Sequence, residues 1–114
     1  MLNDPVSAHF ESLKKTNVVL YGLEAHVCMR QTAFDLLERD INVHLVVDAC
    51  SSMGHHDRNV GISSMQAAGV TLITFQSLLF EMIRGADHPN FKQCLPLLKD
   101  NPESPIDLYY PGQL

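Results

Sequence analysis

The segment from Asn17 to Glu38 constrains the fold of this chain more than any other part of the sequence. Asn17 to Leu23 contains four consecutive large apolar residues, which is typical of a strand buried in a parallel sheet. Gly22 interrupts this run, and from His26 onward apolar residues return at helical spacing. The segment therefore predicts a strand, a tight turn and a helix.

One cysteine, Cys28, falls in the first turn of that predicted helix. Free backbone N–H groups and the positive end of the helix dipole gather there, and both favour the thiolate over the neutral thiol. A thiolate attacks carbonyl carbons, so Cys28 is the candidate nucleophile. The competing interpretation is that Cys28 packs as a small apolar residue, as free cysteines often do.

The alternation of strands and helices continues along the chain. The sequence predicts further strands at Val43–Val47 and Thr71–Phe75, and helices at Asp4–Lys15, Asp57–Ala68, Ser77–Arg84 and Phe91–Leu98. The apolar face of the Asp57–Ala68 helix is expected to consist of Val60, Ile62, Met65 and Ala68. Three alternations of strand and helix predict the α/β class: a three-layer, Rossmann-like arrangement with a parallel sheet of about three strands and flanking helices. Right-handed crossovers place the connecting helices on one face, so the other face needs separate cover.

Length and composition favour one small domain. The chain has 114 residues, of which 46% are apolar, enough for one core. We expect the domain to occupy residues 1–100. Residues 101–114, which contain three prolines and one glycine, are predicted to form an extended tail.

Charge and cysteine content limit the partners and cofactors. The net charge is −5, and Lys and Arg are scattered, which argues against nucleic acid and anionic membranes as partners. Three cysteines at positions 28, 50 and 94 show no paired metal spacing. His55, His56 and Asp57 are expected in a solvated loop, with Asp57 capping the next helix. We expect no metal and no cofactor.

The cysteine count also bears on location, since an odd number of scattered thiols suits a reducing compartment. No apolar run reaches the roughly 18 residues that a membrane span requires. The N-terminal residues lack the basic and apolar pattern of a secretory signal. A cytoplasmic location is the default, with mitochondrial, nuclear and peroxisomal locations left open.

Four segments together resemble the isochorismatase-like cysteine hydrolases, with the animal isochorismatase domain-containing proteins as the most similar branch. They are Tyr21–Cys28, Gln31–Leu37, Val43–Ser52 and Ala86–Lys92. A complete member of that family has six parallel strands, and this chain resembles its C-terminal half. The resemblance therefore implies that the strand at Asn17–Leu23 lies at an exposed edge of the sheet, where it can pair with another chain.

The resemblance also implies a catalytic mechanism. In the family a cysteine attacks a carbonyl or carboximidate carbon, an aspartate acts as general base, and a lysine orients or stabilises charge. Carried over by position, Cys28 is the nucleophile, and the backbone N–H groups of Glu24 and Cys28 form the oxyanion hole. The peptide bond Leu23–Glu24 is the candidate for a cis bond. The substrate class is a small amide, ester or vinyl-ether-like compound.

The aspartate and the lysine of the family have no counterpart in these 114 residues. General-base assistance is typically worth ~10²–10⁴-fold in rate, so we expect this chain alone to be a poor hydrolase. An alternative function is a catalytically silent α/β module that acts by oligomerisation or protein interaction. A homo-oligomer is expected in either case. A third possibility is a chain that hardly folds alone.

Two further residues are candidates for the pocket, each with a competing structural role. Asp48 follows a predicted strand and either positions a loop or ligand, or caps the turn through Ser51 and Ser52. His26 either touches substrate near Cys28 or is a surface residue at the start of a helix. The other two cysteines are interpreted as packing residues.

Overall fold

The computed structural model describes residues 2–99 and contains a three-stranded parallel sheet in the order β1-β2-β3. The strands are β1 (Asn17–Leu23), β2 (Asn42–Ser51) and β3 (Thr71–Ile73). Helices flank both faces of this sheet, so the α/β class with a parallel sheet is confirmed. The predicted tail at residues 101–114 lies outside the described residues.

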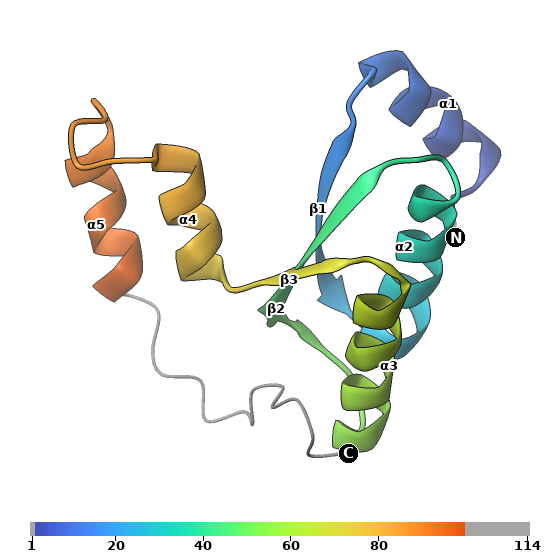
Figure 1. Cartoon of the computed structure of the whole chain (residues 1–114). Coiled ribbons are helices and arrows are strands. Elements are labelled where there is room, and N and C mark those ends of the chain that lie inside the picture. Colours follow the sequence, from blue (N-terminus) through green and yellow to red (C-terminus); the bar gives the residue numbers. More distant parts are fainter. Residues whose placement is uncertain (1, 100–114) are drawn as a thin grey trace.

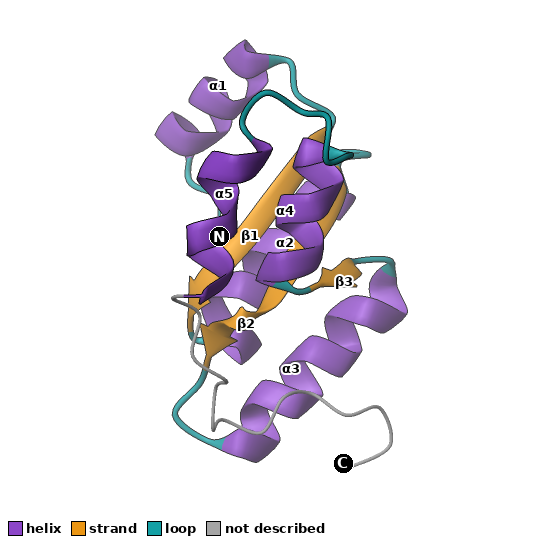
Figure 2. Ribbon diagram, turned by 90° about the vertical axis from the view of Figure 1, so that its left-hand side faces the viewer, coloured by secondary structure: helices purple, strands orange, loops and turns teal. Residues whose placement is uncertain are grey.

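Two groups of helices cover opposite faces of the sheet. The helical elements are α1 (Asp4–Leu13), η1 (Ala25–Met29), α2 (Arg30–Leu37), α3 (His55–Ala68), α4 (Phe75–Ile83) and α5 (Phe91–Lys99). Figure 1 shows α2 and α3 on one face, as right-handed crossovers require, with α1 at the end of the sheet beside α2. Figure 2 shows α4 and α5 in front of the opposite face. None of the described helices is long and apolar enough to cross a membrane.

The main core lies between the sheet and the helices α2 and α3. Its largest fully buried side chains are Leu36, Val43, Leu45, Ile62 and Met65. A smaller buried group on the opposite face consists of Val46, Ile73 and the α4 residue Ile83. The sheet is therefore covered well on one face, and on the other mainly where α4 contacts β2.

Strand β1 is buried on one face only, which corrects the prediction of a fully buried strand. Val18 and Leu20 pack against the core, whereas Val19, Tyr21 and Leu23 are 40%, 69% and 74% exposed. Alternate strand residues point to opposite faces, so these three side chains share the face opposite α2 and α3. β1 also lies at an edge of the sheet, as the family resemblance implied.

A bulge in β2 shifts its register against β1. Leu20 pairs with Leu45, but Gly22 pairs with Cys50, so β2 contains three extra residues between these two pairs. Pairing then continues from Leu23 to Ser51. The predicted end of this strand at Val47 is therefore wrong, because β2 resumes pairing with β1 after the bulge.

The buried face of α3 differs from the predicted one. Arg58 and Gly61 are buried beside Ile62 and Met65, whereas Val60 is 57% exposed. Ala68 is also exposed. The helix begins at His55 after an extended Gly54, so Asp57 lies in its first turn and is not its N-cap residue.

Helix α4 begins earlier than the sequence predicted. Thr74 is its N-cap, and its hydroxyl oxygen accepts a hydrogen bond from the Ser77 backbone N–H at 3.3 Å. The predicted strand through Phe75 is therefore shortened to Ile73, and Ser77 is not the cap. At α1 the cap is Asn3, whose side chain accepts from the Val6 N–H at 3.2 Å.

Candidate functional site

The turn after β1 is formed by Glu24, which adopts a left-handed conformation with φ 59° and ψ 68°. Glu24 is the single residue between the end of β1 at Leu23 and the start of η1 at Ala25. The described residues contain no cis peptide bond, so the Leu23–Glu24 bond is trans and that expectation is not met. The direction of the chain changes through the φ of Glu24 instead.

Cys28 lies in η1, a single π-helical turn that leads directly into α2. The carbonyl of Glu24 accepts hydrogen bonds from the N–H groups of Val27 at 3.1 Å and Met29 at 3.3 Å. The second of these spans five residues, which defines the π geometry and widens the turn. The Cys28 thiol is free and half-buried. The predicted sequence of strand, turn and helix around Cys28 is thus present, with a π turn at its centre.

The His26 side chain lies beside a serine that follows the C-terminal end of β2 and a carboxylate of the preceding turn. Its Nδ1 atom lies 2.9 Å from the Ser52 hydroxyl and 3.6 Å from a carboxylate oxygen of Glu24. Side chains two residues apart on a helical turn do not face each other. The residues that line the nearby cavity of about 260 Å³ are His26, Arg30, Asp57, Val60, Gly61 and Ser64. Cys28 is not among the lining residues of this cavity, and a contact of His26 with substrate near Cys28 stays a prediction.

Gly61 lets α3 approach η1 closely. A Cβ atom at Gly61 would lie 2.6 Å from the Cα of His26 and 2.8 Å from its Cβ, which is closer than such atoms approach. Next to this contact, the Arg30 Nε donates a hydrogen bond to the Ser64 hydroxyl at 2.8 Å. The π turn is therefore held against α3 from both of its ends.

Asp48 anchors the junction between β3 and α4, which is compatible with the predicted role of positioning a neighbouring loop. One oxygen of its carboxylate accepts a hydrogen bond from the Phe75 backbone N–H at 2.8 Å. Phe75 is the first residue of α4, so the carboxylate satisfies an N–H group that has no partner within the helix. Asp48 thus connects β2 to the start of α4, and a contact of Asp48 with a ligand stays a prediction.

The other cysteines occupy different environments. Cys50 is buried in the core at 6% exposure, which agrees with its predicted packing role. Burial raises the pKa of the Cys50 thiol, and the Gly22 backbone N–H and the positive charge of Arg58 only partly oppose this rise in pKa. Cys94 is half-buried on α5.

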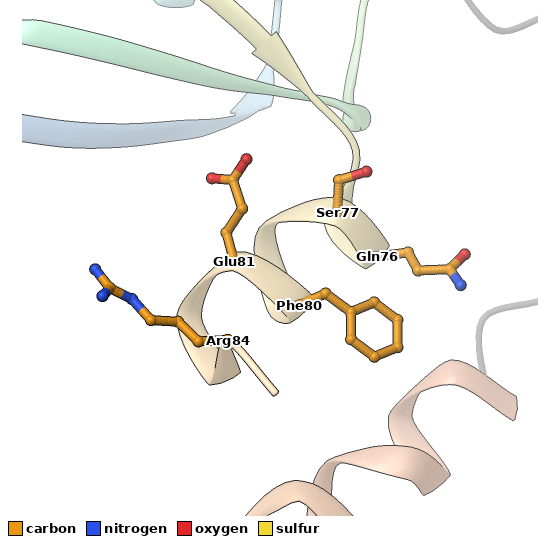
Figure 3. Close-up of a pocket in the computed structure, with 5 residues that line it drawn as sticks. All are labelled: Gln76, Ser77, Phe80, Glu81 and Arg84. Atoms are coloured by element: carbon orange, nitrogen blue, oxygen red, sulfur yellow. The ribbon is translucent and has the colours of Figure 1, made fainter. Parts of the chain in front are cut away.

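A large open hollow lies elsewhere, beside α4, with a volume of about 790 Å³. Figure 3 shows its lining residues: Gln76, Ser77, Phe80, Glu81 and Arg84. Gln76 and Phe80 point to one side, Arg84 points to the other, and Glu81 points toward the sheet. These side chains do not converge on a point, and none of them is a predicted site residue. The chemistry of the chain is therefore better sought at Cys28.

Among the described residues, no group of three or more His, Cys, Asp or Glu side chains is placed to hold a metal ion. His55, His56 and Asp57 share the first turn of α3, where all three are exposed.

The sequence analysis missed three residues near the π turn: Ser52 and Gly61, which contact His26, and Arg58, which is buried against β2. Two of them left a signal in the sequence. A glycine inside a helical pattern often marks a close backbone approach, and Gly61 is such a residue. Arg58 precedes Ile62 by four residues and Met65 by seven, which places it on the buried face. An arginine is nevertheless read as exposed by default.

The fold and this turn define a class: an α/β domain with a parallel sheet, whose edge strand leads into a π turn carrying a half-buried thiol. The isochorismatase domain model matches residues 1–77. This chain belongs to the isochorismatase family, as the sequence resemblance predicted.

Relatives of known name support the same assignment. The chain is 41% identical over 98 residues to mouse isochorismatase domain-containing protein 2A, a match that covers 85% of this chain and 48% of that protein. Human isochorismatase domain-containing protein 2 is 40% identical over the same length, with the same shares covered. The chain thus spans about half the length of the curated relatives that it matches.

Solved structures show the same fold. A Caenorhabditis elegans structure described as MAR1 ribonuclease superposes with a TM-score of 0.83 at 40% identity, covering 96% of this chain and 57% of that chain. The Escherichia coli YcaC gene product, described as an octameric hydrolase of unknown specificity, superposes with a TM-score of 0.70 at 19% identity. That match covers 85% of this chain and 54% of that chain, and it bears on the fold alone.

Proposed function

We propose that Cys28 is the nucleophile of a cysteine hydrolase that acts on a small amide, ester or vinyl-ether-like substrate. One observation carries the proposal: Cys28 is a half-buried free thiol in a π turn between a parallel strand and a helix, inside the segment that matches the isochorismatase domain. Irregular helical turns of this kind frequently occur at functional sites.

The proposed reaction begins with attack of the Cys28 thiolate on the carbonyl-type carbon of the substrate. The N–H groups of Glu24 and Cys28 are proposed to donate hydrogen bonds to the oxyanion that forms, which is a large stabilising contribution in such reactions. For an amide or ester, the tetrahedral intermediate collapses to a thioester while the leaving group takes a proton from water. A water molecule then hydrolyses the thioester, which releases the acid and regenerates Cys28. No step requires a metal or an organic cofactor, so turnover should be indifferent to chelators.

The base and the lysine of the family have no counterpart in residues 1–114. We therefore propose that these residues alone turn substrate over slowly, while Cys28 remains more reactive than an ordinary thiol. Family membership favours this hydrolase over the silent oligomerisation module.

An RNA substrate is the competing possibility, because the C. elegans relative is described as a ribonuclease. Binding RNA requires clustered cationic side chains. This chain has 8 Lys and Arg against 13 Asp and Glu, with a net charge of −5. A small uncharged substrate fits that balance better.

The test compares two thiols of the same molecule. Peptide mass spectrometry after brief iodoacetamide treatment at pH 7 gives the alkylation rates of Cys28 and Cys94, both half-buried. We expect Cys28 to react about tenfold faster, because the access and surroundings of each thiol control its reactivity. Equal rates would contradict the proposal. In parallel, Cys28→Ala should abolish residual hydrolysis of a small-substrate panel, whereas Cys94→Ala should not. Cleavage of RNA that survives Cys28→Ala would point to another site.

Self-association belongs to the same proposal. Among the described residues, no strand pairs with the outer edge of β1, and Val19, Tyr21 and Leu23 are exposed on one face. Exposed apolar edge strands pair readily with another chain. We propose that copies of this chain associate through β1.

A further inference from the structure

We propose that Arg58 is a positioning residue for Cys28, an inference that rests on the proposed function of that thiol. Arg58 is the fourth residue of α3 and is only 3% exposed. A buried guanidinium is costly unless its donors find acceptors. The hydrogen-bond acceptors of Arg58 therefore indicate which part of the structure this side chain holds in place.

Two backbone carbonyls of β2 accept hydrogen bonds from this guanidinium. Its Nε donates to the Cys50 carbonyl at 3.0 Å, and its Nη2 donates to the Val47 carbonyl. Val47 lies within the bulge of β2, and Cys50 is the residue at which pairing with β1 resumes. One side chain thus bridges the inside of the bulge and its end.

The bulge determines where β1 ends. Because the pairs Gly22–Cys50 and Leu23–Ser51 form only after the three extra residues, the bulge aligns the last two residues of β1. Glu24 follows at once, and its carbonyl accepts the hydrogen bonds that form the π turn around Cys28. A change in the bulge is therefore transmitted through Leu23 to the turn.

A second route leads from the bulge to the same turn. Ser52 follows the paired end of β2, and its hydroxyl lies 2.9 Å from the Nδ1 of His26 inside η1. Gly61, one turn of helix after Arg58, meets the backbone of His26 directly. Arg58 is thus placed between β2 and the contacts that fix η1.

Stability alone does not account for an arginine here. No ion pair is formed by Arg58 in the part of the chain that the structure describes, and its Nη1 is buried with no hydrogen-bond partner there. The planar fork of a guanidinium reaches two carbonyls in a fixed geometry, which a lysine ammonium does not reproduce.

The experiment measures the ratio of the Cys28 and Cys94 alkylation rates in wild type, Arg58→Lys and Arg58→Met. Arg84→Met is the matched control, because Arg84 is exposed at the end of α4. Cys94 serves as the internal reference in every variant. Thermal melting identifies variants that fold cooperatively.

We expect the ratio to fall about tenfold in Arg58→Met, because the turn that positions Cys28 loses its support. Arg58→Lys should recover part of the ratio, because its ammonium keeps the charge and can donate to one carbonyl, and Arg84→Met should not change it. A cooperative Arg58→Met variant with the wild-type ratio would overturn the positioning role. Failure of both Arg58 variants to fold would also overturn it, since Arg58 would then serve stability. A wild-type ratio of one would instead contradict the proposed function itself.

Discussion

At the scale of single residues, the three cysteines show how environment separates chemically identical side chains. Cys28 is half-buried in an irregular turn, Cys94 is half-buried on a helix, and Cys50 is enclosed in the core. Reactivity depends on access and on how well the thiolate is stabilised. A cysteine count from sequence cannot make this distinction, but the position of each thiol in the fold does.

Cys50 makes the stability of the chain depend on pH in the alkaline range. Its pKa is raised in the folded state, mainly by burial, above the value of about 8.5 for a free thiol. Above pH 8.5 the unfolded chain therefore loses this proton before the folded chain does, and the contribution of Cys50 to the free energy of unfolding declines as pH rises. The contribution is fully present below that pH.

The test of this dependence is the loss of stability on Cys50→Ala at two pH values. Urea denaturation should show a larger loss at pH 7 than at pH 9.5. Cys94→Ala is the control for removing a thiol as such. An equal loss from Cys50→Ala at both pH values would show that the Cys50 thiol does not titrate differently in the folded and unfolded states.

At the scale of elements, the contact between α3 and η1 depends on one missing side chain. A Cβ at Gly61 would meet the Cα and Cβ of His26 at under 3 Å. The backbone of η1 has to move to admit it, and overpacking of this kind typically costs about 1–3 kcal/mol. Gly61→Ala should therefore destabilise the chain, although alanine is the better helix former.

Chemical denaturation of Gly61→Ala and Val60→Ala checks this expectation. Val60 is an exposed neighbour on the same helix, so its truncation should change the free energy of unfolding by less than about 0.5 kcal/mol. A stabilised Gly61→Ala variant would mean that the backbone of η1 can move aside without lowering the free energy of unfolding. The Cys28 alkylation rate of Gly61→Ala reports whether the π turn has moved.

The strands and helices were easier to predict from the sequence than the contacts between them. The apolar run before Gly22 and the helical spacing after it were enough to predict strand, turn and helix around Cys28. The buried face of α3 was mispredicted because Arg58 and Gly61 are buried by partners on other elements, which a local pattern does not contain. The Leu23–Glu24 bond shows the limit of carrying geometry across by resemblance, since here the turn is formed by the φ of Glu24.

At the scale of the whole molecule, the sheet is covered unevenly. α2 and α3 bury one face along the strands, whereas the opposite face of β1 exposes Val19, Tyr21 and Leu23 at the edge. The family resemblance predicted this open edge. Side chains along β1 alternate between the two faces of the sheet. Once one face is known to pack against the core, the exposed residues of β1 can be identified from this alternation.

Self-association through β1 predicts that Tyr21→Lys yields a monomer at protein concentrations where the wild-type chain associates. A charge on an edge strand opposes pairing with another chain. Sedimentation velocity measures the change. Met82→Lys is a matched control, because Met82 on α4 is 72% exposed and Tyr21 is 69% exposed.

Two outcomes would contradict association through β1. The first is a wild-type chain that sediments as a monomer at all concentrations. The second is an equal effect of Tyr21→Lys and Met82→Lys, which would indicate a general response to added charge.

The contacts of the π turn form in an order that follows synthesis of the chain on the ribosome. All strand pairs are parallel, and Asn17 finds its partner only at Asn42. Ser52 and Gly61, which contact His26, are made later still. At about 5–20 residues per second, Gly61 follows Cys28 by roughly 2–7 s. During synthesis Cys28 is therefore an unprotected thiol first and a positioned one only afterwards, so a reducing environment matters most before the domain is complete.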